Sequence, residues 1–281
     1  MSKWFYRWAP SLGELEDTPE NIWGISSYDA SKHLYENVVF CGMYGFPDFY
    51  SLWQHKGKKV VWWAGDDIRH FKGGYWLDED GQIRMIPKPL AEWINTYCDN
   101  YIENEIERDL LADIGIDARI VQSFLGEISK FPISYKHARV PNVFVSGHPG
   151  REEEYGFEYV EKIAKKVPGC IFHLYGAKWK SKLKNIVCHG IVSKDQFNKE
   201  IKKYQCGWRP NKRDGFSEIL AKSVLMGQHP ISRIPYPNIN SYNTETILLF
   251  YLHLLSFRYC SNTFSADYYR ETLNNYPWVK L

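Results

Sequence analysis

Short apolar runs that alternate with helical segments constrain the fold of this chain more than any other feature. Residues 37–42 and 59–65 are two such runs, and each ends in glycine. Residues 47–55, between them, begin at a proline suited to the first turn of a helix. A strand, a helix and a second strand at this spacing form a βαβ unit, which requires parallel strands. Because the runs lack polar alternation, the sequence predicts a parallel sheet covered on both faces.

The same alternation continues and then restarts in the second half of the chain. Strands are expected at 22–26, 100–102, 118–122, 142–147, 170–175, 186–190, 205–208 and 230–233, and helices at 88–97, 103–114, 153–167, 194–203 and 246–255. Residues 126–140 have mixed polarity and form the expected linker. Two α/β units in 281 residues predict two doubly wound domains, over 1–137 and 138–265. Residues 266–281 are expected to pack back on the first domain.

Charge and cysteine usage narrow the compartment and the ligand class. Residues 1–140 hold 15 Lys and Arg against 21 Asp and Glu, whereas residues 141–281 hold 20 against 12, so the second half suits an anionic ligand. The six scattered cysteines form no C-x-x-C pair, which fits buried thiols in a reducing cytoplasm. No run approaches the ~18 apolar residues of a membrane span, so no integral membrane segment is expected.

Residues 214–227 are the most informative stretch for function. Asp214-Gly215-Phe216-Ser217-Glu218 is predicted to form a glycine turn that leads into a short apolar helix. Arg209, Lys212 and Arg213 come just before it. Free amides at a helix N-terminus, together with neighbouring cations, suit a diphosphate. An ordinary loop-to-helix start with solvated basic residues is the alternative interpretation.

This stretch resembles the donor-site signature of retaining GT-B glycosyltransferases of the family 4 type. That signature has an acid, Gly-Phe, a second acid eight positions after the first, and a closing glycine. Asp214, Gly215-Phe216 and Gly227 match it, whereas Lys222 stands where the second acid belongs. In the family that acid typically holds the ribose of the nucleotide, and a lysine cannot accept hydrogen bonds from hydroxyls.

Two loops add to the resemblance. Trp63-Ala64-Gly65-Asp66-Asp67 closes a strong strand candidate and is similar to the Gly-Ser-Asp element of many GT-B enzymes; a plain turn capped by an aspartate is the alternative. The loop 147–151 lies where the family often carries an Arg and a Lys that grip the donor diphosphate. Arg151 is the candidate there, and Tyr155-Gly156 replaces the usual Lys-Gly. Arg209 is expected to compensate, together with Lys212 or Arg213. His148 is expected to be a cap or a surface residue.

The resemblance implies an α/β protein with two facing Rossmann-like domains and parallel sheets, the GT-B fold. It implies a glycosyltransferase that uses a nucleoside-diphosphate sugar, most often a UDP-sugar, as co-substrate and retains its configuration. It implies no cofactor and no metal. The C-terminal domain would hold the nucleotide sugar, and the N-terminal domain the acceptor: a glycan, a glycolipid or a modified DNA base.

The resemblance also implies roles for individual residues. Asp67 and Asp214 are expected to be catalytic, with Asp214 holding sugar hydroxyls, and Trp63, Gly65 and Asp66 are expected to line the acceptor cleft. The expected donor-binding residues are Arg151, Arg209, Lys212, Arg213, Gly215, Phe216, Ser217, Glu218 and Lys222. Spacing on the helix separately allows Lys222 to reach the donor phosphates or to pair with Asp214 or Glu218. Glu218, four residues away on the same helix face, is the better partner.

Two alternative functions remain open. Compact GT-B enzymes also glucosylate modified bases in DNA, and the basic run 178–184 with Trp179 would suit a polyanion, although a solvated loop explains it as well. Lys222 would also fit a non-catalytic binding protein that kept the fold. The D-x-D sequence Asp78-Glu79-Asp80 lies in a polar turn and is expected to be exposed rather than to bind metal.

Overall fold

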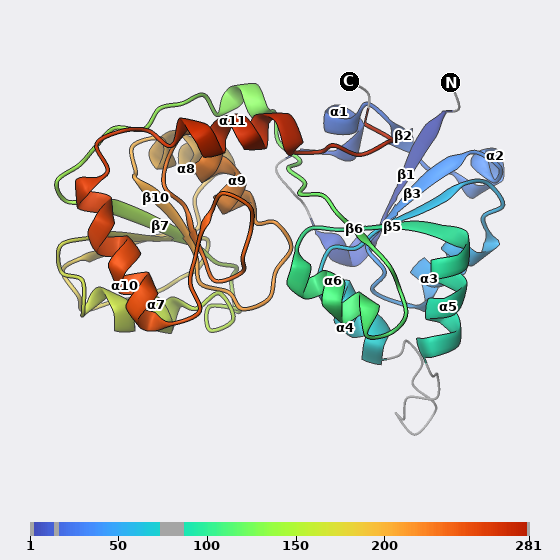
Figure 1. The fold of residues 1–281 in the computed structure, drawn as a ribbon, viewed down its shortest axis with the longest axis horizontal. Helices are drawn as coiled ribbons and strands as arrows, with labels where there is room; N and C mark the ends of the chain where they lie inside the picture. Colours follow the sequence, from blue (N-terminus) through green and yellow to red (C-terminus); the bar gives the residue numbers. More distant parts are fainter. Residues whose placement is uncertain (1–2, 14–16, 74–86, 280–281) are drawn as a thin grey trace. The chain divides into compact units, whose positions relative to one another are not determined.

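The structure is a computed structural model that describes residues 3–13, 17–73 and 87–279. It divides into two compact units (Figure 1). Unit 1 comprises residues 1–126, 213–216 and 272–281, and unit 2 comprises 127–212 and 217–271. The division falls at residue 126, earlier than the boundary expected at 137. Residues 127–137 lie in unit 2, where the backbone amides of Ser134 and Tyr135 both donate to Met226 O.

Unit 1 contains a six-stranded sheet of order β2-β1-β3-β4-β5-β6, and all its strand pairs are parallel. The strands are β1 Trp4–Trp8, β2 Ser26–Ser27, β3 Asn37–Cys41, β4 Lys59–Trp62, β5 Cys98–Ile102 and β6 Arg119–Ile120. The helices are α1 Pro19–Trp23, α2 Ala30–His33, α3 Phe46–Gln54, α4 Asp66–Gly73, α5 Pro87–Tyr97 and α6 Glu105–Ala112. Side chains pack on both faces of the sheet, so its central strands are buried. This arrangement agrees with the apolar runs in their sequence.

Unit 2 repeats the architecture with the order β12-β11-β10-β7-β8-β9, again with parallel pairs. The strands are β7 Asn142–Ser146, β8 Ile171–Tyr175, β9 Ile186–Gly190, β10 Cys206–Arg209, β11 Ile231–Ser232 and β12 Asn240–Ser241. The helices are α7 Phe157–Ala164, α8 Lys194–Ile201, α9 Glu218–Leu225, α10 Glu245–Leu254 and α11 Thr263–Thr272. The predicted α/β class with two Rossmann-like parallel sheets is therefore confirmed.

The expected strand at 22–26 is wrong. Pro19–Trp23 is helix α1, and the strand there is only Ser26–Ser27. Thr18 Oγ1 accepts the amide of Asn21, and Gly24 ends the helix at φ 65°. The Thr-Pro-Glu start and the glycine stop outweigh the β-branched and aromatic residues between them. Helix α7 also begins later than expected, at Phe157, because Gly156 has φ 75°.

The end of the chain belongs to unit 1. Asn274 Nδ2 donates to Phe124 O (2.8 Å), and its Oδ1 accepts Phe124 N (3.0 Å). Tyr276 OH donates to Val121 O (2.8 Å). Trp278 is buried against Tyr276 with the two rings stacked 4.5 Å apart. These contacts complete a core that the first 126 residues leave open.

Candidate functional site

Arg209 is a buried cation at the carboxyl end of β10. Its side chain is nearly inaccessible, with the residue 7% exposed. The guanidinium carbon lies 4.6 Å from the centre of the Tyr155 ring, and Nη1 donates to Ser146 O at the end of β7 (3.4 Å). Tyr155 occupies the place of the lysine that is usual in the GT-B signature. Its ring packs against the guanidinium of Arg209 and so orients it. Strand ends of parallel sheets are where ligands of such folds bind.

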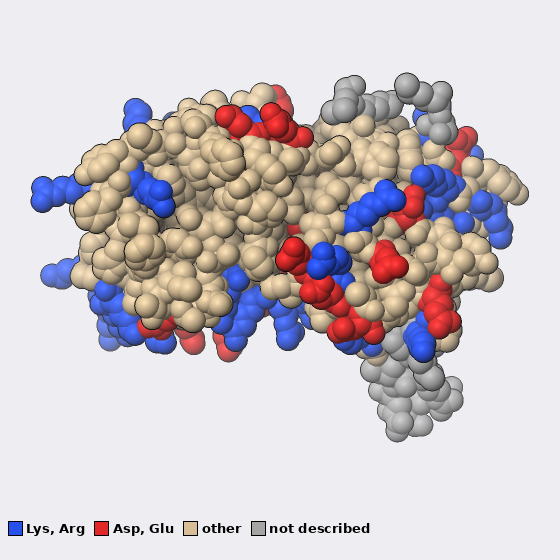
Figure 2. Space-filling model, in the orientation of Figure 1, with Lys and Arg blue, Asp and Glu red and all other residues tan. Residues whose placement is uncertain are grey.

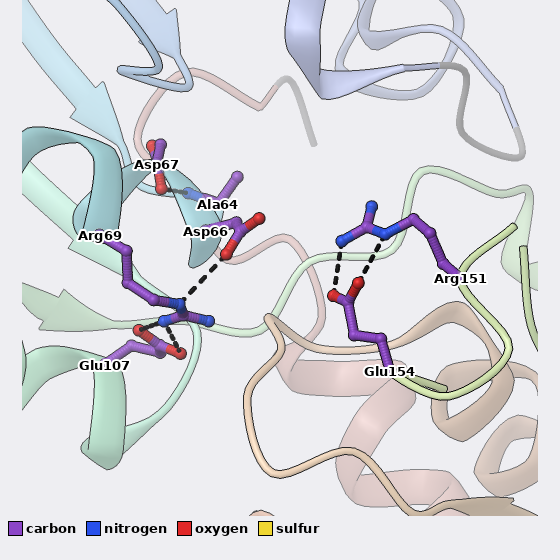
Figure 3. A network of polar contacts seen from close by, with 7 residues as sticks. All are labelled: Ala64, Asp66, Asp67, Arg69, Glu107, Arg151 and Glu154. Atoms are coloured by element: carbon purple, nitrogen blue, oxygen red, sulfur yellow. Dashed lines mark hydrogen bonds and ion pairs between the residues drawn. The ribbon is translucent and has the colours of Figure 1, made fainter. Parts of the chain in front are cut away.

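Arg151 and the basic residues after β10 are more exposed. Arg151 forms a two-point ion pair with Glu154, with N–O distances of 2.7 and 2.5 Å, shown at close range in Figure 3. Lys212 and Arg213 are both exposed. His148 is exposed as well, with Nδ1 3.0 Å from Pro149 O. A ligand that binds Arg151 would have to compete with Glu154 for its guanidinium.

Helix α9 begins where the sequence predicts. Ser217 is its N-cap residue in extended conformation and makes no side-chain cap bond, which leaves its hydroxyl available. Gly207 on β10 permits close packing of this helix, because an added Cβ would lie 2.9 Å from atoms of Ile219 and Ser223. Glycine at this point in the strand therefore sets how closely α9 approaches the sheet.

Lys222 is the departure from the family signature, and its environment is unusual. It is 3% exposed, and its Nζ lies 5.7 Å from the ring centre of Phe131 and 5.3 Å from that of Phe197. Nζ also lies 3.4 Å from Glu218 Oε2, so the ion pair predicted from helical spacing is confirmed. The two aromatic rings and the Glu218 carboxylate together offset the free-energy cost of removing the Lys222 ammonium from water.

At the end of β4 in unit 1, a turn places one aspartate inside and one outside. Asp66 is exposed and accepts from Arg69 Nε (3.1 Å), and Arg69 Nη1 reaches both oxygens of buried Glu107 (3.1 Å each), as Figure 3 shows. Trp63 is fully buried and donates to Asn100 Oδ1 (3.2 Å). Gly65 has φ 102°, a conformation that favours glycine.

Asp67, for which a catalytic role was expected, lies inside unit 1 just after β4. It is fully buried, and its carboxylate accepts the amides of Met43 (2.9 Å) and Ala64 (3.1 Å). Burial raises the pKa of Asp67 to about 7, although these amides lower it. Both oxygens are occupied by backbone donors, which favours a structural role in fixing the turn before α4. A catalytic role for Asp67 therefore stays a prediction.

Glu103 is a buried carboxylate whose sequence position predicted only the start of a helix. It follows β5 directly and accepts the amide of Phe216 on Oε2 (2.7 Å) and the amide of Ser123 on Oε1 (3.0 Å). Asn104 donates from Nδ2 to Asp214 O (2.9 Å). An acid at the carboxyl end of a parallel strand was the signal that could have singled it out.

Gly215 and Phe216 pack closely against these groups within unit 1. A Cβ added to Gly215 would lie 2.2 Å from Glu103 Oε2, so this position has no room for a side chain. Phe216 is buried. The signature Asp214-Gly215-Phe216 thus lies in unit 1, whereas Ser217 and Glu218 lie in unit 2.

The basic run 178–184 alternates in exposure. Its four lysines are exposed, while Trp179 and Leu183 pack on the core of unit 2 and Trp179 meets Phe157 edge-on at 5.7 Å. On the face drawn in Figure 2, charged side chains of both signs stand near one another and much of the surface is uncharged. Because Trp179 is used for packing, it offers no free stacking platform for a base.

Metal ligands and membrane segments can be assessed only for the described residues. In that part of the chain no group of three or more His, Cys, Asp or Glu side chains is arranged to hold a metal ion. Asp78, Glu79 and Asp80 lie outside the described residues. Among the described helices, none combines the length and apolar character needed to cross a bilayer.

Comparisons with known proteins bear on the fold. No family model and no curated protein matches the chain. Sucrose-phosphate synthase from Thermosynechococcus elongatus matches with a TM-score of 0.62 at 10% identity, over 87% of this chain and 71% of that one. Anabaena HepE in complex with UDP matches with 0.59 at 7% identity, over 96% and 99%. A TarM variant from S. aureus, crystallised with fondaparinux, α-GlcNAc-glycerol and UDP, matches with 0.54 at 14% identity, over 83% and 52%.

These structural neighbours are GT-B glycosyltransferases, so the chain has the fold of that class. The chain spans about half the length of the TarM and GtfA structures that it matches. At 7–14% identity this similarity shows the fold alone. The reaction has to be inferred from the residues of this chain.

Proposed function

We propose that the protein is a glycosyltransferase that moves a sugar from a nucleoside-diphosphate sugar, with a UDP-sugar as the first candidate, to an acceptor hydroxyl. The observation that carries the proposal is Arg209. It is buried at a parallel strand end, oriented by Tyr155, and followed within a few residues by the N-terminus of α9. A desolvated arginine fork next to helix amides suits the phosphates of such a donor.

The donor-side roles follow from the contacts. Arg209 neutralises phosphate oxygens, and exposed Lys212 and Arg213 raise the local concentration of an anion. The hydroxyl of Ser217 and the first amides of α9 bind phosphate or sugar oxygens. Pairing with Lys222 offsets the charge of Glu218, which would otherwise repel a diphosphate. We assign Asp214 the sugar hydroxyls and Arg151 an outer phosphate contact that requires release from Glu154.

The acceptor-side roles are assigned to unit 1. Asp66 is an exposed carboxylate at the carboxyl end of β4, and Gly65 beside it has the positive φ that this turn requires. Trp63 supports this turn from the core. The acceptor class proposed is a glycan or glycolipid hydroxyl, because no contact described above favours a modified DNA base.

The neighbours support the choice of UDP as a probe. HepE has been solved with UDP and with UDP-glucose, and pneumococcal GtfA with UDP and GlcNAc. Retention of configuration is proposed from the resemblance of residues 214–227 to the family 4 signature. Catalysis would rest on positioning the two sugars and stabilising the charge of the leaving diphosphate.

Calorimetry with UDP, UMP, ADP and GDP, followed by a transfer and hydrolysis screen of UDP-sugars, tests the proposal. Binding of UDP with turnover of one UDP-sugar is expected. Binding without turnover in the full screen would favour a non-catalytic binding protein, and no binding of any nucleotide would contradict the proposal. Salt-dependent binding of duplex DNA would reopen the DNA-base acceptor.

The rate of transfer in the presence of a chelator distinguishes this proposed donor site from one that uses a metal ion. Arginine and lysine side chains supply the positive charge in the proposal, so transfer is expected to continue at full rate in EDTA. The measurement is the initial rate with and without EDTA, then with added manganese. Loss of transfer in EDTA that manganese restores would contradict the assignment of phosphate binding to Arg209 and its neighbours.

A further inference from the structure

Glu103 combines deep burial with a set of partners that all donate. The residue is 4% exposed, and its Oε1 accepts both the amide (3.0 Å) and the hydroxyl of Ser123. Its Oε2 accepts the amide of Phe216 (2.7 Å). The Glu103 carbonyl in turn accepts Gln122 Nε2 (3.0 Å). Each carboxylate oxygen is thus matched to a different backbone amide, one on either side of the group.

The segment that Glu103 contacts, residues 214–216, is also held by other close contacts. Asn104 Nδ2 binds Asp214 O (2.9 Å), and Gly65 approaches the same segment so closely that an added Cβ would lie 3.2 Å from Gly215 N. Gly215 lies directly against Glu103 Oε2. Residues 214–216 are therefore held within unit 1 by two neighbouring side chains and by glycine contacts on the backbone.

Opposing effects act on the pKa of Glu103. Burial raises its pKa to about 8, while the bonds from Ser123 and Phe216 lower it and the nearby charge of Asp214 raises it. Tyr276 also interacts with Glu103 electrostatically within unit 1. A carboxylate that accepts only is best satisfied when ionised, so the docked segment favours the charged form.

We propose that Glu103 is a positioning residue that fixes the backbone of Asp214-Gly215-Phe216 and thereby orients Asp214 for the donor sugar. This inference rests on the proposed function for the role of Asp214, whereas the docking of the segment on Glu103 does not. Loss of the carboxylate should loosen residues 214–216 and slow transfer, and should leave the phosphate contacts of Arg209 in place.

The diagnostic variant is Glu103→Gln, because it keeps the shape while it removes the charge and replaces one acceptor oxygen by an NH₂ donor. In either amide orientation its NH₂ faces a backbone N–H, of Ser123 or of Phe216, so one buried donor must lose its acceptor. Glu105→Gln is the matched control, since Glu105 is an exposed acid two residues later on the surface.

Hydrogen exchange of peptides covering 210–220 is the first readout. In Glu103→Gln the amides of 214–216 are expected to exchange roughly tenfold faster, the effect of leaving one buried donor unpaired. In the wild type, exchange corrected for its intrinsic pH dependence should slow between pH 6.5 and 9 as the carboxylate ionises, and the variant should lose this dependence. Unchanged exchange in the variant would overturn the inference.

Kinetics provide the second readout. We expect kcat for UDP-sugar turnover to fall by roughly tenfold in Glu103→Gln and the Kd for UDP to stay within about threefold of wild type. A matching loss of UDP affinity would overturn the separation of roles. If the wild type binds no UDP, the proposed function fails, and the exchange experiment still decides whether Glu103 holds the segment.

Should Glu103→Gln fail to fold, Ser123→Ala takes its place. It removes one donor from Oε1 and leaves the amide contacts, so a smaller acceleration of exchange in 214–216 is expected. An exchange pattern identical to wild type in that variant, with its hydroxyl lost, would count against the network.

Discussion

Arg209 and Lys222 are both cations buried beside aromatic rings in unit 2, but they differ in what else they contact. Arg209 lies at a strand end, where its guanidinium packs on the Tyr155 ring and Nη1 donates to Ser146 O (3.4 Å). Lys222 is enclosed by Phe131 and Phe197 and paired with Glu218. Arg209 contacts a backbone carbonyl at a strand end, whereas the charge of Lys222 is paired with a carboxylate within unit 2. Their substitutions should therefore act on different properties.

Arg209→Ala should weaken UDP binding by roughly 2–4 kcal/mol, the loss expected when a charge-assisted partner of a partly buried anion is removed. Isothermal calorimetry at fixed salt measures it. Arg233→Ala is the matched control, because Arg233 also lies over a tyrosine ring, that of Tyr159 at 5.9 Å. Equal affinities in wild type and Arg209→Ala would remove this residue from the binding site.

Lys222→Glu should not raise activity and should destabilise unit 2 by about 3 kcal/mol, because it buries a second carboxylate beside Glu218. Lys222→Met, which keeps the apolar stem, should lose less than about 1 kcal/mol because Glu218 is 31% exposed and stays partly hydrated. Urea denaturation and the Kd for UDP are measured together. A large gain in donor affinity in Lys222→Glu would show that the wild-type site is degraded and would favour a non-catalytic protein.

At the scale of elements, β8, β9 and α8 share a polar network inside unit 2. His173 Nδ1 lies 2.9 Å from His189 Nε2, and Tyr175 OH donates to Glu200 Oε2 (2.6 Å). Burial lowers the pKa of His173 to about 4, with a further decrease from His189 and an opposing effect of Glu200. Burial also lowers the pKa of His189. The folded unit therefore keeps His173 neutral.

This network predicts a pH dependence with a definite sign. The pKa of His173 is lower in the folded state than its ordinary value of 6.5, so its contribution to stability is complete above pH 6.5 and is lost as pH falls toward 4. The unfolding free energy of unit 2 should fall over that window, and less steeply in His173→Gln. Urea titrations at three pH values measure the slope, with exposed His253→Gln as the control. Equal slopes in wild type and His173→Gln would contradict the prediction.

Elements with clear local signals were predicted, and those without were missed. The helix expected at 194–203 forms as α8, and Ser193 Oγ at its start accepts Gln196 N (3.2 Å). Strand β1 and helices α4 and α11 were not expected. The sequence Trp4–Trp8 is aromatic with no apolar run, and α4 is strongly polar beyond Ile68. Their packing against neighbours, rather than their own pattern, stabilises them.

At the scale of the whole molecule, unit 1 is assembled from three separate stretches of chain. Its last stretch inserts Trp278 among Trp23, Tyr101 and Tyr276, with ring centres 4.5–5.7 Å apart. Folding of this unit therefore depends on residues that lie about 150 positions after its first stretch. A contact between distant stretches contributes to stability only after a long loop has closed.

Trp278→Ala should destabilise unit 1 by roughly 3–5 kcal/mol through the cavity it leaves, while unit 2 keeps its stability. Hydrogen exchange of β3 and β5, compared with β7 and β8, separates the two units. Phe264→Ala is the control, because that aromatic ring is 73% exposed. Equal protection of β3 in wild type and Trp278→Ala would show that the end of the chain adds nothing to the core.

The sequence by itself determined the repeated parallel α/β pattern, the glycines that end the strands and the helix that begins after Ser217. These features are local: strand periodicity, turn residues and caps act over a few neighbouring positions. Only the tertiary structure decided that Asp67 is buried, that Phe131 and Phe197 enclose Lys222, and that Glu103 meets Phe216. These contacts are made between residues that are far apart in the chain. The burial that they cause cannot be predicted from the spacing of neighbouring residues.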